Sequence, residues 1–265
     1  NGDGNLSGLN SSTFMSAYWA NVKLMYQAIG AVAKPTLVNF EPDFWGYTQQ
    51  RAPSGDPSQL FAYVNSNPDC AGLTNDVIGI VGCMLAMAHK YAPNAYVGFP
   101  PSDWGGPNQA SVIAYMNTIG AQHADFIVTQ PLDRDAGCYE AHATASGCNP
   151  HNTITWYLDE TNTTTPNYSQ DLAVQQNYHN GIGGLPLVWW QTPLGVPSST
   201  PGGTANHFRD NHVHYFLTHA SELAAAGGLA VVFGTGNNFQ TSIDSDGGQF
   251  QSLSAAYLAA PATLP

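Results

Sequence analysis

The sequence predicts a parallel α/β fold, in its simplest form a TIM-like (β/α) barrel that makes one domain of residues 1–265. Short apolar runs that end in Gly, Pro, Asn or Asp alternate with longer segments whose apolar residues recur every three or four positions. Strand and helix in regular alternation indicate parallel βαβ units. At 265 residues the chain is also long enough to bury the core of such a domain.

Six apolar runs are the predicted strands. Each is short and ends in residues that favour turns. These runs cover residues 36–45, 95–104, 125–135, 153–162, 185–195 and 229–238. The predicted helices before and between them cover residues 13–32, 74–92, 109–122, 169–183 and 210–227.

The number of strands leaves the architecture open. A closed barrel of this type needs eight strands, so either two β/α units precede Asn1, or lie in another chain, or the barrel has fewer strands. An open doubly wound sheet is the structural alternative. No GxGxxG or GxxxxGK[ST] phosphate loop follows any of the runs, which counts against that alternative.

Side-chain alternation predicts which residues point into the barrel. Leu37, Asn39 and Glu41 share one face of the first run, and its two polar members favour the interior. Each strand then brings a polar group to its carboxyl end, where barrel enzymes have their active sites. The same rule selects, on the other runs, Val97, Phe99 and Asp103; Ile127, Thr129 and Asp133; Thr155, Tyr157 and Asp159; Leu187, Trp189 and Gln191; and Phe233, Thr235 and Asn237.

The composition excludes several classes of partner. Lys and Arg number 6 against 18 Asp and Glu, a formal net charge of -12, which excludes nucleic acid and anionic membrane surfaces. No run of 18 apolar residues is present to span a membrane. Abundant neutral polar residues suit a secreted, extracellular protein, and we expect that any signal peptide has been removed or lies outside this sequence.

Four cysteines form two local pairs along the chain. We expect disulfides between Cys70 and Cys83 and between Cys138 and Cys148, although four cysteines allow three pairings. A zinc site is the alternative, and no CxxC spacing supports it.

Two strand ends carry carboxylates beside aromatic residues. The first reads FEPD at residues 40–43, followed by Phe44, Trp45 and Tyr47, and the second reads YLDETN at residues 157–162. Together with the predicted barrel, these motifs resemble the cellulase-like and endoglycanase-like glycoside hydrolases. Phe40 stands where the large retaining superfamily has Asn before its acid/base glutamate, so the family and the choice between retention and inversion stay open.

The resemblance implies a secreted hydrolase that cleaves a neutral polysaccharide with a pair of carboxyl groups. Glu41 is the candidate general acid, because the adjoining aromatic residues could desolvate it. Asp159 and Glu160 compete as its partner: alternation favours Asp159, and Glu160 has the longer reach. Asp43 is expected to hold a sugar hydroxyl or to position Glu41.

Aromatic and polar residues near the other strand ends are candidates for substrate binding. Flat aromatic rings stack on the apolar faces of sugar rings, and amide, carboxylate and imidazole groups bond sugar hydroxyls. The candidates are Trp45, Tyr47, Trp104, Asp133, Trp189, Trp190, Gln191, His207 and Asn237.

Metal chemistry is a weaker hypothesis, and no cofactor is expected. His207, His212, His214 and His219 lie close in sequence, and His212-Val-His214 is similar to the HxH of barrel metallohydrolases. The pair falls in a predicted helix, however, where positions i and i+2 face apart. The aspartate-glycine clusters at residues 1–8 and 244–248 fit turns better than calcium loops.

A carbohydrate-binding barrel without catalytic activity is the second functional hypothesis, either alone or as one module of a larger protein. Rim aromatics suit both cases. Two carboxylates within about 5–10 Å of each other would favour catalysis, and a single Glu41 without a partner would favour binding. Serine hydrolase chemistry is excluded, since no GxSxG motif is present.

Overall fold

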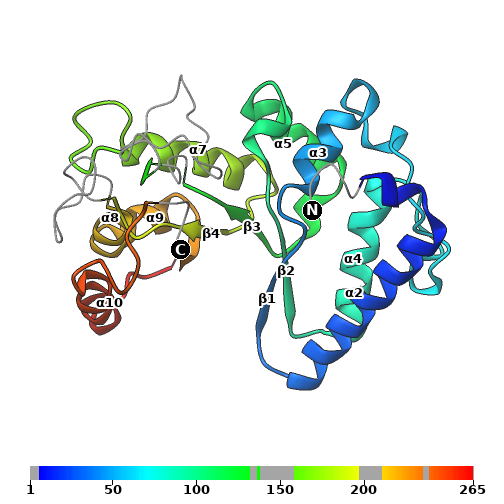
Figure 1. The fold of residues 1–265 in the computed structure, drawn as a ribbon, viewed down its shortest axis with the longest axis horizontal. Helices are drawn as coiled ribbons and strands as arrows, with labels where there is room; N and C mark the ends of the chain where they lie inside the picture. Colours follow the sequence, from blue (N-terminus) through cyan, green and yellow to red (C-terminus); the bar gives the residue numbers. More distant parts are fainter. Residues whose placement is uncertain (1–5, 132–135, 138–157, 197–210, 235–238, 265) are drawn as a thin grey trace. The chain divides into compact units, whose positions relative to one another are not determined.

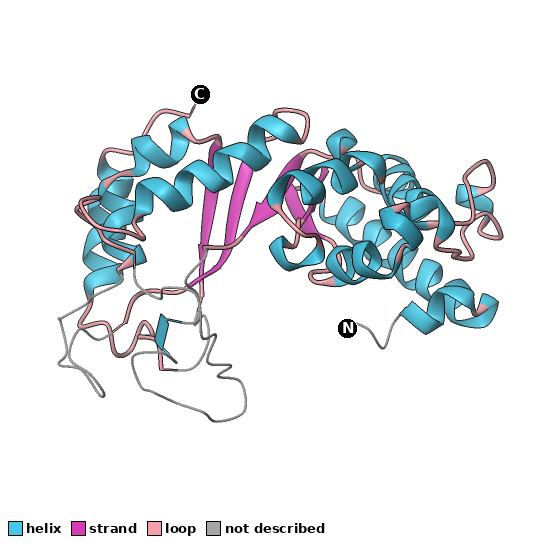
Figure 2. Cartoon of the chain, turned by 90° about the horizontal axis from the view of Figure 1, so that it is seen from above, coloured by secondary structure: helices cyan, strands magenta, loops and turns pink. Residues whose placement is uncertain are grey.

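The computed structural model describes residues 6–131, 136–137, 158–196, 211–234 and 239–264. These residues form parallel α/β structure (Figures 1 and 2). The chain divides into two compact units, of which the first comprises Asn1–Val128 and Asn180–Leu185 and the second Thr129–His179 and Pro186–Pro265. The single barrel domain stays a prediction.

Five of the six predicted strands fall in the described residues, and all five are confirmed as strands. They are β1 (Thr36–Asn39), β2 (Ala95–Phe99), β3 (Phe126–Thr129), β4 (Leu187–Thr192) and β5 (Gly228–Phe233). Most of the run at residues 153–162 lies outside the described residues, and within its described end Asp159 makes an isolated parallel bridge to Asn167. The strands of the described residues do not close an eight-stranded barrel.

In the first unit β1, β2 and β3 pair in parallel. The register sets Val38 beside Val97 and Asn39 beside Gly98, and Gly98 beside Phe126. Position 98 requires glycine, because a Cβ atom there would lie 2.2 Å from the Phe126 ring. The ring of β3 therefore covers β2 at this point.

Four helices accompany this sheet: α2 (Ser12–Val32), α3 (Phe44–Arg51), α4 (Val77–Tyr91) and α5 (Gln109–Thr118). Three of them are preceded by a residue whose side chain accepts a hydrogen bond from a backbone N–H of the first turn. Such a cap gives a partner to an N–H group that has none within the helix. Ser11 caps α2, Asp76 caps α4 and Asn108 caps α5. Figure 1 shows α2 and α4 lying side by side. Short 3-10 helices cover Ser7–Asn10, Pro53–Gly55, Pro57–Gln59, Pro68–Cys70, Asp103–Gly105 and Ala121–His123.

An aromatic cluster joins β1 and β2 to the helices. The ring of Phe40 lies 5.9 Å from Tyr26 of α2 and 6.5 Å from Phe99 of β2, between ring centroids. Trp45 of α3 packs edge-on against Phe99 at 5.1 Å. All four side chains are buried. Aromatic side chains of this size bury a large apolar area each, so this cluster is a main part of the first unit's core.

The register corrects one prediction about faces. Partners in adjacent parallel strands project to the same side of the sheet, so Val97 and Phe99 lie on the side of Val38 and Phe40. Leu37 and Asn39 project to the other side. The expectation that Val97 and Phe99 share one interior face with Leu37 and Asn39 is therefore wrong, because polarity at the end of β1 did not identify the face of the strand.

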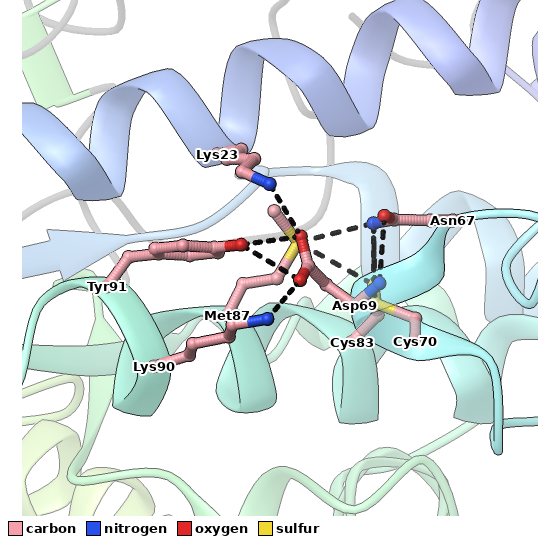
Figure 3. Close-up of polar contacts among 8 residues, drawn as sticks. All are labelled: Lys23, Asn67, Asp69, Cys70, Cys83, Met87, Lys90 and Tyr91. Atoms are coloured by element: carbon pink, nitrogen blue, oxygen red, sulfur yellow. Dashed lines mark hydrogen bonds and ion pairs between the residues drawn. A yellow bond between two sulfur atoms is a disulfide. The ribbon is translucent and has the colours of Figure 1, made fainter.

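A disulfide fastens the loop before α4. Cys70 bonds to Cys83, with Cα atoms 5.3 Å apart, which confirms the predicted pairing. Cys138 and Cys148 lie outside the described residues. Next to the disulfide, Asp69 accepts hydrogen bonds from Lys90 at 2.5 Å, Lys23 at 3.2 Å and the Tyr91 hydroxyl at 2.8 Å (Figure 3). The Lys90 bond is the main reason that the pKa of Asp69 falls to about 2.

In the second unit β4 and β5 pair in parallel, and Leu187 lies beside Gly228. Trp189 of β4 packs against Phe216, and Tyr168 stacks on Tyr215 with centroids 4.0 Å apart. These buried rings make much of this unit's core. The described residues of this unit include the helices α7 (Tyr168–Gly181), α8 (His212–Thr218), α9 (Ala220–Ala225) and α10 (Gln249–Ala259).

The aspartate-glycine cluster at residues 244–248 is a turn that leads into α10. Asp246 is buried, and its carboxylate accepts the backbone N–H groups of Gly248 at 2.9 Å and Phe250 at 2.7 Å. Its oxygens are thereby used in holding the turn. Neither α10 nor α3 was among the predicted helices. Within the described residues, no helix has the length and apolar character needed to cross a membrane.

We predict that the Cys70–Cys83 bond stabilises the fold by about 3 kcal/mol, because it closes a loop between two residues 13 positions apart in the unfolded chain. Replacing both cysteines by alanine should lower the free energy of unfolding in urea by that amount. Alanine is chosen over serine because it places no hydroxyl group in the buried site. An unchanged unfolding free energy, or peptide mapping that finds a free thiol at Cys70, would contradict the prediction.

Candidate active site

The chain turns sharply where β1 ends. Glu41 and Asp43 both have left-handed backbones, with φ of 52° and 68°, and Pro42 lies between them. Few residues other than glycine adopt this conformation, and it persists only where the surroundings enforce it. The carbonyl of Glu41 accepts the N–H of Phe44 at 3.1 Å, so the turn passes directly into α3. Such strain in non-glycine residues is found most often at functional sites.

Glu41 is held by a tyrosine from α2. The hydroxyl of Tyr18 donates a hydrogen bond of 3.0 Å to Oε1 of Glu41, and both side chains are half-buried. Burial, and then the charge of Glu41, raises the pKa of Tyr18 well above its ordinary value. Tyr18 therefore keeps its proton and remains a donor to the carboxylate at any pH near neutral.

Glu41 and Tyr18, which bonds to its carboxylate, both line a small pocket of about 60 Å³. Phe14 and Tyr18 of α2 and Phe44 of α3 contribute aromatic walls. Leu9, Met15 and Ile80 complete an otherwise apolar lining. A carboxylate at the end of a parallel strand, in a largely apolar pocket, has the position that a barrel enzyme gives to a reacting group.

The aromatic residues of the first unit that we expected to bind substrate differ in how far they are exposed to solvent. Trp45 is 1% exposed, and its indole N–H donates to the carbonyl of Phe40 at 2.9 Å, so in this structure it packs in the core. Trp104 is 44% exposed and lies edge-on to Tyr47, with centroids 4.7 Å apart. Gly46 permits this, since a Cβ there would lie 2.6 Å from the Trp104 ring. Tyr47 and Trp104 are thus the two with rings near solvent.

Asp159 is occupied by its own loop. One carboxylate oxygen accepts the backbone N–H of Thr161 at 2.9 Å, and the other accepts those of Thr163 at 2.8 Å and Thr164 at 2.7 Å. The hydroxyls of the same three threonines donate as well. These bonds, with that from Thr164 foremost, hold the pKa of Asp159 well below its ordinary value. The carboxylate therefore organises the turn that follows it.

Glu160, the next residue, has a different environment. Its side chain is half-buried, and Oε1 lies 3.4 Å from Nδ1 of His214 in α8. Burial raises the pKa of Glu160, and the charges of His214, His219 and His212 oppose that rise. A carboxyl group that retains its proton to higher pH is what a general acid requires. Of the two candidates in the second unit, Glu160 has the environment that suits acid chemistry.

The remaining candidates of the second unit are placed as follows. Trp189 is fully buried in the core, Trp190 is partly exposed, and Gln191 is exposed with a left-handed backbone of φ 48°. Asp133, His207 and Asn237 lie outside the described residues. Glu41 belongs to the first unit and Asp159 and Glu160 to the second, so the partnership of Glu41 with either of them stays a prediction.

The histidines of α8 face apart, as the helix predicted at residues 210–227 implies. His212 is buried against the rings of Tyr168 and Phe216, whereas His214 is exposed beside Glu160. Among the described residues, no group of three or more His, Cys, Asp or Glu side chains is arranged to hold a metal ion. The metal hypothesis, which also drew on His207, stays untested.

Tyr18 and Phe14 are the site residues that sequence reasoning missed. Both lie on α2, and Tyr18 precedes Glu41 by 23 residues. Their four-residue spacing puts both rings on one face of the helix, but the same spacing describes any buried helix face. A signal specific to the pocket is therefore absent from the sequence.

Neither a scan against protein-family models nor searches of curated proteins and solved structures found a match to this chain. Its function is therefore inferred from its own residues.

The raised pKa of Glu160 predicts a pH dependence of stability. Below its ordinary pKa of 4.5 both folded and unfolded chains hold the proton. Because the folded chain binds this proton more tightly, stability should fall as the pH rises from about 4.5 through the raised folded pKa. Glu160→Gln should flatten this part of the curve of unfolding free energy against pH.

A matched variant tests the cause. His214→Gln removes the opposing charge, so the fall should extend to higher pH in that variant. Chemical denaturation at half-unit steps between pH 4 and 7 measures both effects. Superimposable curves for the wild type and Glu160→Gln would show that burial does not perturb this carboxyl group.

Proposed function

We propose that this chain is a secreted glycoside hydrolase of barrel type, in which Glu41 provides a catalytic carboxyl group. The observation that carries the proposal is the position of Glu41: a strained turn at the carboxyl end of β1 holds it in a pocket, with Tyr18 bonded to one oxygen. Glycosidic cleavage needs a positioned carboxyl group of this kind.

Three further observations support the proposal. The strands are parallel and alternate with helices, as barrel units do. Tyr47 lies one helical turn after Phe44 and forms, with Trp104, a ring pair near solvent that suits stacking on sugars. The Cys70–Cys83 disulfide agrees with an oxidising, extracellular environment.

A specific observation favours a second candidate, carbohydrate binding without cleavage. Among the described side chains that line the pocket, Glu41 is the one carboxylate. Cleavage needs a second carboxyl group to attack the anomeric carbon or to activate water. A binding module needs only the pocket and the ring pair, so measurement of turnover separates the two candidates.

We predict that the protein releases reducing ends from a neutral glucan, mannan, xylan or chitin, and that Glu41→Gln lowers the rate about 10²- to 10⁴-fold, as loss of a general acid or base does. Binding of a neutral glycan should be nearly unchanged, because the amide preserves the shape of the side chain. Asp43→Asn, an exposed carboxylate two positions away, is the matched control and should cost far less.

Circular dichroism should show that both variants fold as the wild type does. If Glu41→Gln keeps more than about a tenth of the wild-type rate, Glu41 is not an acid/base group of ordinary strength. Binding of a glycan without release of reducing ends would support the carbohydrate-binding candidate instead.

A second prediction separates Asp159 from Glu160. Glu160→Gln should lower turnover with little loss of thermal stability, because Glu160 has a raised pKa and does not organise its loop. Asp159→Asn should lower the melting temperature more, because an amide NH₂ cannot accept the N–H groups that the carboxylate accepts. Rates on the cleaved glycan and melting curves for both variants check this; the opposite ranking would make Asp159 the catalytic candidate.

A further inference from the structure

We propose that the pocket beside Glu41 binds a protonated amine of an amino-sugar polymer, such as deacetylated chitin. The inference rests on the proposed function, because it names the substituent that the same site recognises. It replaces a wholly neutral substrate by one that carries positive charge.

The carboxylate has room for a cationic partner. Tyr18 uses one acceptor position on Oε1 of Glu41, and a carboxylate offers about four. Among the described residues, no Lys, Arg or His side chain forms an ion pair with Glu41. A half-buried carboxylate without a cation gains most from a ligand that supplies one, because the bond is charge-assisted and the charge is already partly desolvated.

The walls of the pocket suit a cation as well. Phe14, Tyr18 and Phe44 contribute aromatic rings, whose faces attract ammonium groups within about 6 Å. Phe14 and Tyr18 lie one helical turn apart on α2 and therefore share a face. Aromatic rings around one carboxylate are a common arrangement for recognising organic ammonium groups.

The size of the pocket indicates that it binds a substituent and not a whole sugar ring. Its volume of about 60 Å³ is roughly four times the 15 Å³ that one water molecule requires. An ammonium group and its carbon fit this space, while the rest of a polymer would lie outside it. The ring pair of Tyr47 and Trp104, one turn along α3 from Phe44, offers a surface for a neighbouring sugar.

An N-acetyl group satisfies the pocket less well. Its carbonyl oxygen needs a hydrogen-bond donor. Tyr18 O–H is the one donor among the lining side chains that the structure describes, and it already bonds to Glu41. The apolar side chains of Leu9, Met15 and Ile80 offer none. The free amine is therefore the better ligand on grounds of hydrogen bonding alone.

The charge of the chain favours a polycation. The formal net charge is -12, with 6 Lys and Arg residues in total. Two of these, Lys23 and Lys90, are paired with Asp69 (Figure 3). An acidic protein attracts a cationic polymer at long range and repels an anionic one, so a polyamine glycan gains in both association rate and affinity.

The test compares two tetrasaccharides that differ only in acetylation. The tetramers of glucosamine and of N-acetylglucosamine should be titrated into the wild-type protein by calorimetry, at a pH where the amines are protonated. We expect the glucosamine tetramer to bind about tenfold more tightly, the difference that one partly desolvated cation contact provides. Glu41→Gln should abolish the preference, and Phe14→Leu, which keeps an apolar wall, should reduce it severalfold.

The controls separate the pocket from the general charge of the chain. Asp244→Asn removes one negative charge at an exposed position of the second unit and should keep the preference. Equal binding of the two tetramers, or a preference that survives Glu41→Gln, would overturn the inference. Equally tight binding of tetralysine would show a general amine site and would also overturn the assignment to an amino sugar.

Failure of this inference differs from failure of the proposed function. If a neutral glycan is cleaved and both tetramers bind equally, the amine-site inference is wrong and the proposed hydrolase function stands. If the glucosamine tetramer binds preferentially and no glycan is cleaved, the proposed hydrolase function is wrong and the amine-site inference stands.

Discussion

The indole N–H of Trp45 donates a hydrogen bond to the carbonyl of Phe40, and that bond fixes the course of the chain between them. Both side chains are buried in the aromatic cluster with Phe99. The chain must therefore leave β1 at Phe40 and enter α3 before Trp45, with Glu41, Pro42 and Asp43 to make the turn. Two left-handed residues result from this constraint.

The turn has a cost, which the burial of Phe40 and Trp45 on either side of it offsets. A left-handed residue other than glycine costs on the order of 1 kcal/mol or more, and glycine could occupy either position at less strain. Asp43 does not even cap α3 with its side chain. In contrast, the carboxylate of Glu41 gains a defined direction, toward Tyr18 and the pocket. Packing explains the turn itself, whereas a glutamate at a position that glycine could occupy with less strain is better explained by function.

The sequence predicts the elements well and their faces poorly. Apolar runs and turn residues locate all five described strands, because burial and turn chemistry act locally. The prediction of which face of β1 points inward was wrong. It counted the alternation of side chains back from Glu41, and the left-handed backbone of that residue breaks the alternation. By alternation Glu41 points away from Phe40, yet it reaches Tyr18 on α2, the helix whose Tyr26 packs on Phe40.

The candidate site shows the same division. Glu41 could be found from its place at a strand end, whereas Tyr18 could not, because a contact across 23 residues leaves no local pattern. Trp45 and Trp189 looked like surface rings because they follow or end strands, and tertiary packing buried them. For a tryptophan, position along a strand does not decide between core and rim.

Hydrogen bonding separates the structural carboxylates of this chain from the candidates for function. Asp159 and Asp246 each accept backbone N–H groups on both oxygens, and Asp69 accepts two lysines and a tyrosine. A carboxylate used in this way cannot bind a ligand without releasing those donors. Glu41 has one such donor, and Glu160 lies beside a single exposed imidazole. Their unused acceptor capacity, and not their place in a sequence motif, is the physical property that sets these two groups apart.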